Sequence, residues 1–107
     1  MRELAVVLLW AASAHAQPAQ HACAVEALTQ ARALLVFHSG DASRVDIDDR
    51  IRTLAPIRNP ANARQRFDVL EIIGHVYRAD YRIRLLYARL PGPCVLMGQE
   101  VIELSSL

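Results

Sequence analysis

The alternation of apolar and polar residues divides the chain into one helical segment and several extended segments. Between Cys23 and His38 the apolar residues recur at spacings of three and four, and neither glycine nor proline interrupts them. This spacing predicts an amphipathic helix that buries one side. Ser39-Gly40 follows, and glycine readily adopts the left-handed conformation found at helix ends. We therefore expect the helix to end there.

Three segments with the composition of β-strands occupy the second half of the sequence. They cover residues 67–77, 81–90 and 94–104, and short turns separate them, which predicts an antiparallel meander. An earlier run, 45–57, begins with alternating apolar and polar residues, which is typical of a strand. It contains Pro56, which limits it to an edge strand. The predicted fold class is α+β, with one N-terminal amphipathic helix packed on a curved three- to four-stranded antiparallel sheet.

The turn between the first two of these strands decides which side chains share a face. A three-residue turn pairs Tyr77 with Tyr81, whereas a two-residue turn shifts the pairing by one and gathers several charged residues on one face. Those residues are Glu71, His75, Arg82 and Arg84. We prefer the three-residue turn, because a disulfide would draw the helix start toward the face that holds Cys94. In the last hairpin we expect Arg84 opposite Glu100, an ion pair that helps to fix the register.

Both faces of the predicted sheet are rich in apolar or aromatic residues, whereas one helix can cover only one face. In the preferred register the uncovered face carries Tyr77, Tyr81, Ile83, Tyr87, Met97 and Val101. Exposed patches of this kind mark interaction surfaces, where tyrosine and methionine are favoured. The alternative is that residues 45–57 fold across this patch and cover it.

The N-terminus has the features of a secretory signal. A short apolar run follows Arg2, and Ser13-Ala-His-Ala16 supplies small residues at the cleavage positions, which predicts a signal peptide over 1–16. A buried helix or a retained anchor is the alternative reading. We expect a flexible leader over 17–22 and a single α+β domain over 23–107. The mature protein would then be periplasmic or secreted, without a stable membrane anchor.

Composition limits the partners and the covalent chemistry. The net charge is +1, which argues against nucleic-acid binding. The two cysteines, Cys23 and Cys94, are an even pair in a chain predicted to be exported, and we expect them to form a disulfide. Two free thiols or half of a metal site are the alternatives. Arg58, Arg64 and Arg66 lie in a polar stretch, 58–66, which we interpret as a solvated loop that could meet a phosphate or an acidic partner.

Residues suited to catalysis or metal binding do not form a recognisable motif. Glu71 and His75 could act as an acid–base pair if a pocket brought them together. The hydroxyl residues lie outside any glycine-flanked nucleophile turn, and the histidines and aspartates lack the spacing of zinc or calcium sites. We therefore predict no catalytic residues, no metal and no cofactor.

These observations favour an exported, disulfide-stabilised protein-binding module, for instance a periplasmic inhibitor or an immunity-type protein. Its partner would be another envelope or secreted protein, or a second copy in a homodimer. The predicted binding residues are Glu71, Tyr77, Tyr81, Tyr87 and Met97. One alternative is a small hydrolase or lyase that uses Glu71 and His75. Another is a structural envelope protein that self-associates.

Overall fold

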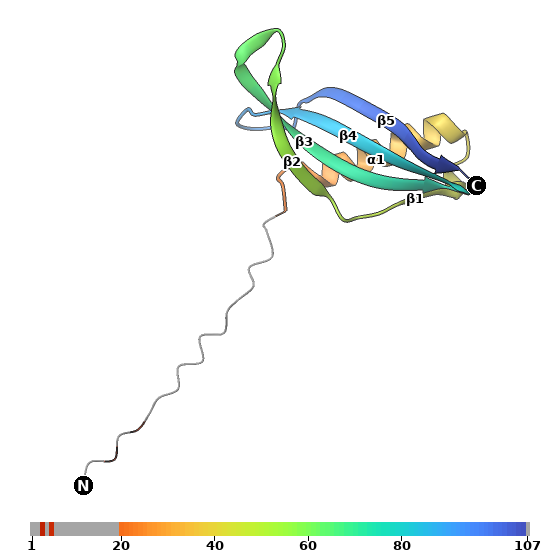
Figure 1. Cartoon of the computed structure of the whole chain (residues 1–107), viewed down its shortest axis with the longest axis horizontal. Helices are drawn as coiled ribbons and strands as arrows, with labels where there is room; N and C mark the ends of the chain where they lie inside the picture. Colours follow the sequence, from red (N-terminus) through yellow and green to blue (C-terminus); the bar gives the residue numbers. More distant parts are fainter. Residues whose placement is uncertain (1–2, 4, 6–19, 107) are drawn as a thin grey trace.

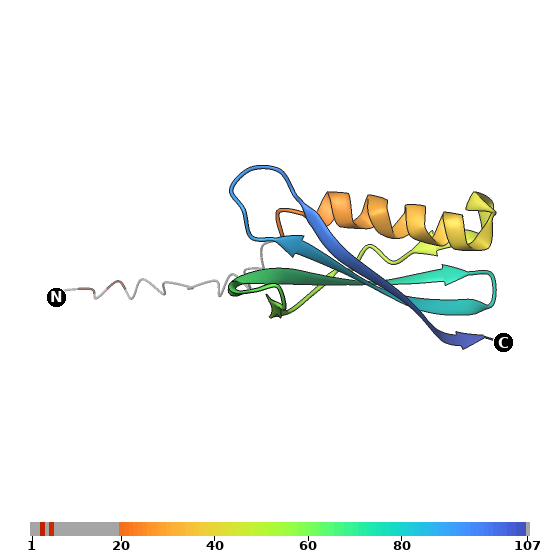
Figure 2. The same cartoon turned by 90° about the horizontal axis from the view of Figure 1, so that it is seen from above.

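The computed structural model describes residues 3, 5 and 20–106, so nearly all of the predicted signal peptide and half of the predicted leader lie outside the described residues. The α-helix α1 (Ala24–Ser39) lies along one face of an antiparallel sheet (Figures 1 and 2). The helix ends where the sequence predicts. Gly40 has φ 74°, and its N–H donates to the carbonyl oxygen of Val36 at 2.8 Å. The predicted α+β class is confirmed.

Five strands form one sheet in residues 20–106. A short 3₁₀ turn (Ala42–Arg44) leads into β1 (Val45–Ile47), β2 (Arg52–Asn59), β3 (Asn62–Val76), β4 (Ala79–Ala88) and β5 (Leu96–Ser106). The order is β1-β3-β4-β5, and β2 pairs with the other end of the long strand β3. The predicted run 45–57 is thus two strands separated by residues 48–51, and the strand that contains Pro56 pairs only with β3.

The stretch 58–66, which we interpreted as a loop, is instead the tip of the β2–β3 hairpin (Figure 1). Asn59 pairs with Asn62 across the turn, and its side-chain oxygen accepts from the Ala61 N–H at 2.9 Å. The Asn62 side-chain oxygen accepts from the Arg64 N–H at 3.1 Å. Polar composition misled the prediction, because a hairpin that extends beyond the core forms its ladder without apolar residues to bury.

The preferred register of the β3–β4 hairpin is wrong. Val76 pairs with Ala79, so the turn has two residues, Tyr77 and Arg78. Tyr77 has φ 54°, a conformation that favours glycine or asparagine, so a tyrosine at this position does not indicate a tight turn. Cys94 lies in the loop before β5 and belongs to neither face, so the disulfide does not select the register.

The core lies between α1 and the sheet. Leu35 of the helix and four strand residues are fully buried there: Leu70, Ile72, Ile83 and Leu85. Ala27 and Ala31 are also fully buried, and their small size allows the helix to approach the strands. The approach is tightest at Gly74, where a Cβ atom would lie 2.4 Å from Leu35 Cδ1. Of the small strand residues, Gly74 therefore makes room for the helix.

The disulfide is formed as predicted. Cys23 and Cys94 are separated by 71 residues, and their Cα atoms lie 5.7 Å apart. The bond ties the start of α1 to the loop before β5. It therefore connects the first and last elements of the fold.

Besides the disulfide, a polar contact between His21 and Asp68 holds the start of α1 against β3. The Cys23 N–H donates to His21 Nδ1 at 3.0 Å, so the ring proton lies on Nε2, which donates to Asp68 Oδ2 at 2.9 Å. Arg89 Nε also donates to Asp68. Burial tends to raise the pKa of Asp68, but the hydrogen bonds from His21 and Arg89 outweigh it and lower the pKa below its usual value.

Asp68→Asn is expected to lower the free energy of unfolding at pH 7 by about 1–2 kcal/mol. A lowered pKa in the folded state stabilises the fold above the unfolded pKa, and this contribution disappears as the pH falls through the folded value. The difference from wild type should therefore shrink below about pH 4. Urea unfolding at several pH values measures it, with the exposed Asp49→Asn as control. A difference that persists unchanged at pH 2 would contradict the assignment.

Candidate functional site

Four charged or titratable residues that are close in the sequence share the sheet face opposite α1: Glu71, His75, Arg82 and Arg84. The two-residue turn puts Glu71 opposite Arg84 and His75 opposite Asp80. In the β4–β5 register Arg84 lies opposite Glu100 and Arg82 opposite Ile102, as expected. The expected ion pair between Arg84 and Glu100 is wrong, because Arg84 bonds to Glu71 and Glu100 meets Arg82. The hairpin alternative that we did not prefer therefore describes this face correctly.

Glu71 is the buried centre of this charged face. Its carboxylate accepts from Arg84 Nε at 2.9 Å and from Arg52 Nη1 at 3.2 Å, one bond to each oxygen. Its side chain is 6% exposed, whereas those of Arg52 and Arg84 are 74% and 36% exposed. The carboxylate is thus held between two cations that reach solvent. It is a structural link between β2, β3 and β4.

His75 is held at the turn end of the same face. Its Nδ1 bonds to Asp80 Oδ1, and the hydroxyl of Ser105 donates to the other Asp80 oxygen at 3.3 Å. The contact with His75, followed by that with Ser105, lowers the pKa of Asp80. Serine and histidine share the carboxylate here, whereas a nucleophilic triad requires the serine to bond to the histidine.

Glu71 and His75 are not brought together. They are four residues apart on one strand, a separation of about 13 Å along β3. Each is engaged with its own partners. A proton cannot pass directly between them at this distance, and the hydrolase or lyase hypothesis gains no support from their placement.

The predicted exposed patch is wrong for three of its six members, Tyr81, Ile83 and Tyr87, which lie in the core. Tyr81 is 7% exposed and Tyr87 is 3% exposed, because both point toward α1 with Ile83. Burial raises the pKa of both phenols. Glu71 is also buried, so these three predicted binding residues are not available at the surface of the free domain.

Two predicted binding residues do reach the surface, at opposite ends of the sheet. Tyr77 is 71% exposed in the β3–β4 turn, where the guanidinium groups of Arg44 and Arg78 lie 5.5 and 5.2 Å from its ring centre. Met97 is 50% exposed at the start of β5, beside a register shift between β4 and β5. They do not form one patch.

The outer edge of β5 is unpaired within residues 20–106, and the strand carries several exposed apolar residues. β5 is the last strand in the sheet order, and within residues 20–106 it pairs only with β4 (Figure 1). Its exposed apolar residues are Leu96, Met97, Val101, Ile102 and Leu104. Glu100 and Glu103 are exposed as well, and the strand contains no basic residue. Sequence reasoning missed this edge, although the order of the strands in a meander would have indicated it.

Comparisons with known proteins add no family. No family model, curated protein or solved structure matches the chain.

No group of three or more histidine, cysteine, aspartate or glutamate side chains within the described residues could hold a metal ion. None of the helices in that part of the chain is long and apolar enough to cross a membrane. The candidate site is the exposed outer edge of β5, an assignment that rests on the strand order and the exposed apolar residues of that strand.

Proposed function

We propose that this protein is an exported, disulfide-stabilised module that binds another envelope or secreted protein through the outer edge of β5. The observation that carries the proposal is the unpaired, apolar edge of this 11-residue strand. The disulfide supports the oxidising location, since such bonds persist in exported proteins. A periplasmic inhibitor or an immunity-type protein remains the kind of role that we propose.

Strand addition is the binding mode that suits this edge. An edge strand presents backbone N–H and C=O groups that an extended segment of a partner can pair with. Natural proteins protect long edges with lysine, proline or very short strands. β5 is long and has neither lysine nor proline; its protective features are two glutamates and the register shifts that interrupt its pairing with β4 near both ends. An edge left open in this way is suited to pairing with a second protein.

The charges on β5 favour a basic partner strand over a second copy. Glu100 and Glu103 are exposed, and only Glu100 has a cation beside it among the described residues, Arg82 Nη2 at 3.5 Å. Two copies paired through β5 would bring four carboxylates to one interface without added cations. A partner strand with arginine or lysine between apolar residues would neutralise them. The homodimer and the self-associating envelope protein are therefore the less favoured alternatives.

Val101→Lys is expected to abolish capture of the partner, because a lysine on an edge strand disfavours strand addition and repels a basic segment. Val25→Lys is the matched control, since Val25 is 70% exposed on α1, away from β5. The oxidised mature domain and both variants serve as baits for the envelope fraction, with quantitative mass spectrometry as readout. Circular dichroism verifies that each variant is folded.

The outcomes separate the alternatives. A partner that is retained by wild type and Val25→Lys but lost with Val101→Lys supports the proposal. Equal retention by both variants would place the contact elsewhere. Sedimentation of the bait alone shows whether a concentration-dependent dimer occupies the edge instead, which would overturn the preference for a different protein.

A further inference from the structure

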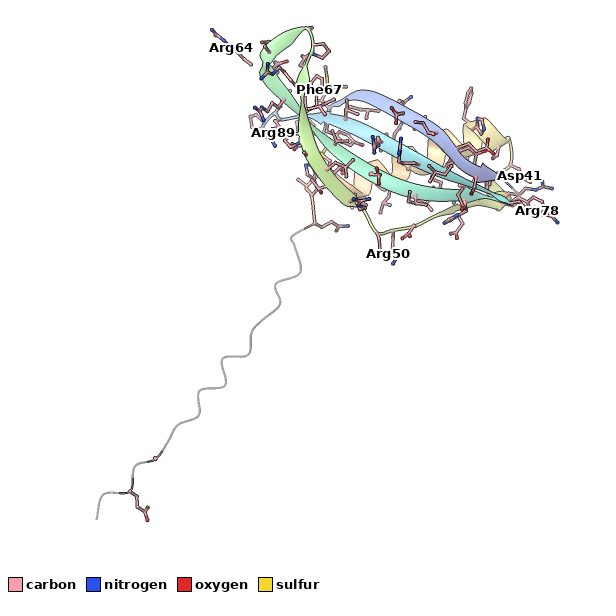
Figure 3. The ribbon with its side chains drawn as sticks, viewed as in Figure 1. Asp41, Arg50, Arg64, Phe67, Arg78 and Arg89 are labelled. Carbon is pink, nitrogen blue, oxygen red and sulfur yellow. A yellow bond between two sulfur atoms is a disulfide. The ribbon has the colours of Figure 1, made fainter. Side chains whose placement is uncertain are left out.

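A pocket of about 330 Å³ lies at the end of the sheet where the β2–β3 hairpin extends beyond the helix. Figure 3 shows Arg64, Phe67 and Arg89 at this end of the molecule, far from Arg78 and Asp41 at the other. Both the start of β3 and the chain between β4 and β5 contribute to the walls. This volume lies at the lower end of the range found for small-molecule sites.

The polar part of the wall is cationic. Arg64, Arg66 and Arg89 line the pocket, and none of the lining residues is acidic. Within residues 20–106, Arg64 and Arg66 have no carboxylate partner. Arg89 bonds to Asp68 through Nε alone, and within residues 20–106 its terminal nitrogens have no hydrogen-bond partner. Guanidinium groups bind carboxylates and phosphates through paired hydrogen bonds.

The rest of the wall is apolar. Phe67 is 6% exposed and points away from α1, and Leu90 and Met97 are 55% and 50% exposed beside it. Methionine adapts its shape to varied apolar ligands. A concave apolar surface beside three cations matches a molecule with an anionic head and an apolar tail. A flat acidic protein surface would contact the arginines but leave this hollow unfilled.

We propose that this pocket binds a small single-chain amphiphile with a carboxylate or phosphate head, such as a medium-chain fatty acid. The head lies among Arg64, Arg66 and Arg89, and the first part of the tail contacts Phe67, Leu90 and Met97. This site is separate from the outer edge of β5, although Met97 belongs to both surfaces. The proposal does not rest on the proposed protein partner.

Decanoate and decyl phosphate, each below its micelle concentration, are the probes. Titration into the ¹⁵N-labelled oxidised domain, with the Met97 methyl group labelled, should give saturable shifts confined to residues 64–67, 88–90 and 97 for at least one probe. Affinity should rise about fourfold per methylene from hexanoate to octanoate. Decanol, which lacks the charge, should bind at least about tenfold more weakly.

Arg66→Gln is expected to weaken binding of the better probe by about tenfold. Arg78→Gln is the control, because it removes the same charge at the far end of the sheet (Figure 3) and should leave the affinity unchanged. If the two variants weakened probe binding equally, the probes would be held by the general charge of the domain and not by this pocket, which would overturn the proposal. Chemical shift changes that do not saturate, or that spread over β5 for both probes, would also overturn the proposal. An affinity that does not depend on tail length would do the same.

Discussion

Replacing both cysteines, Cys23→Ala with Cys94→Ala, is expected to lower the free energy of unfolding by about 4 kcal/mol. The bond closes a chain segment of 71 residues, and the loss of loop entropy in the unfolded chain favours the folded state by roughly this amount. Domains of this size are stabilised by only about 5–10 kcal/mol in total. Denaturant unfolding of the mature domain, read by circular dichroism, measures the difference.

The control is the wild-type domain under strongly reducing conditions, which should match the double alanine variant. Agreement between the two would show that the lost stability comes from the bond and not from the packing of the side chains. A difference of less than about 1 kcal/mol between oxidised wild type and the variant would contradict the account. It would mean that the core and the His21–Asp68 contact suffice to hold the helix start.

Glu71→Gln is expected to lower the free energy of unfolding by about 3 kcal/mol. Breaking a fully buried ion pair costs about 3–5 kcal/mol, and the exposure of Arg52 and Arg84 reduces this, because water stabilises cations that lose their partner. Glutamine keeps the size of the side chain but presents one donor group to two cations. Thermal unfolding should show a large drop in the midpoint.

Glu100→Gln is the matched control, since Glu100 lies on the same face but is 48% exposed and meets only Arg82 at 3.5 Å. Its loss should cost less than about 1 kcal/mol. If Glu71→Gln had an equally small effect, the carboxylate would be free for another role. The acid–base hypothesis for Glu71 would then deserve a direct assay.

The local pattern of residues was sufficient to predict most elements of the fold. The spacing of apolar residues located α1, and Gly40 marked its end. The runs of β-branched residues located β3, β4 and β5, and an even pair of cysteines in a chain predicted to be exported indicated the disulfide. The helix and strand signals depend on residues close together in the sequence. The disulfide signal depends on the number of cysteines.

Signals that depend on pairing were missed. The face of every residue in β4 follows from one turn, and Tyr77 in a left-handed conformation is not a residue that indicates such a turn. With the wrong register, Tyr81 and Tyr87 were placed on the open face, although they belong to the core. The pocket beside Phe67 could not be predicted from the sequence either, because it depends on a polar hairpin whose sequence resembles a loop.

Amide hydrogen exchange of β5 tests the central claim most directly. In the free oxidised domain we expect alternate β5 amides, those that do not face β4, to exchange without protection at every protein concentration. In the complex with the captured partner these same amides should become protected. Protection already present in the free domain, or an unchanged pattern in the complex, would contradict the account that this edge is open and is where the partner binds.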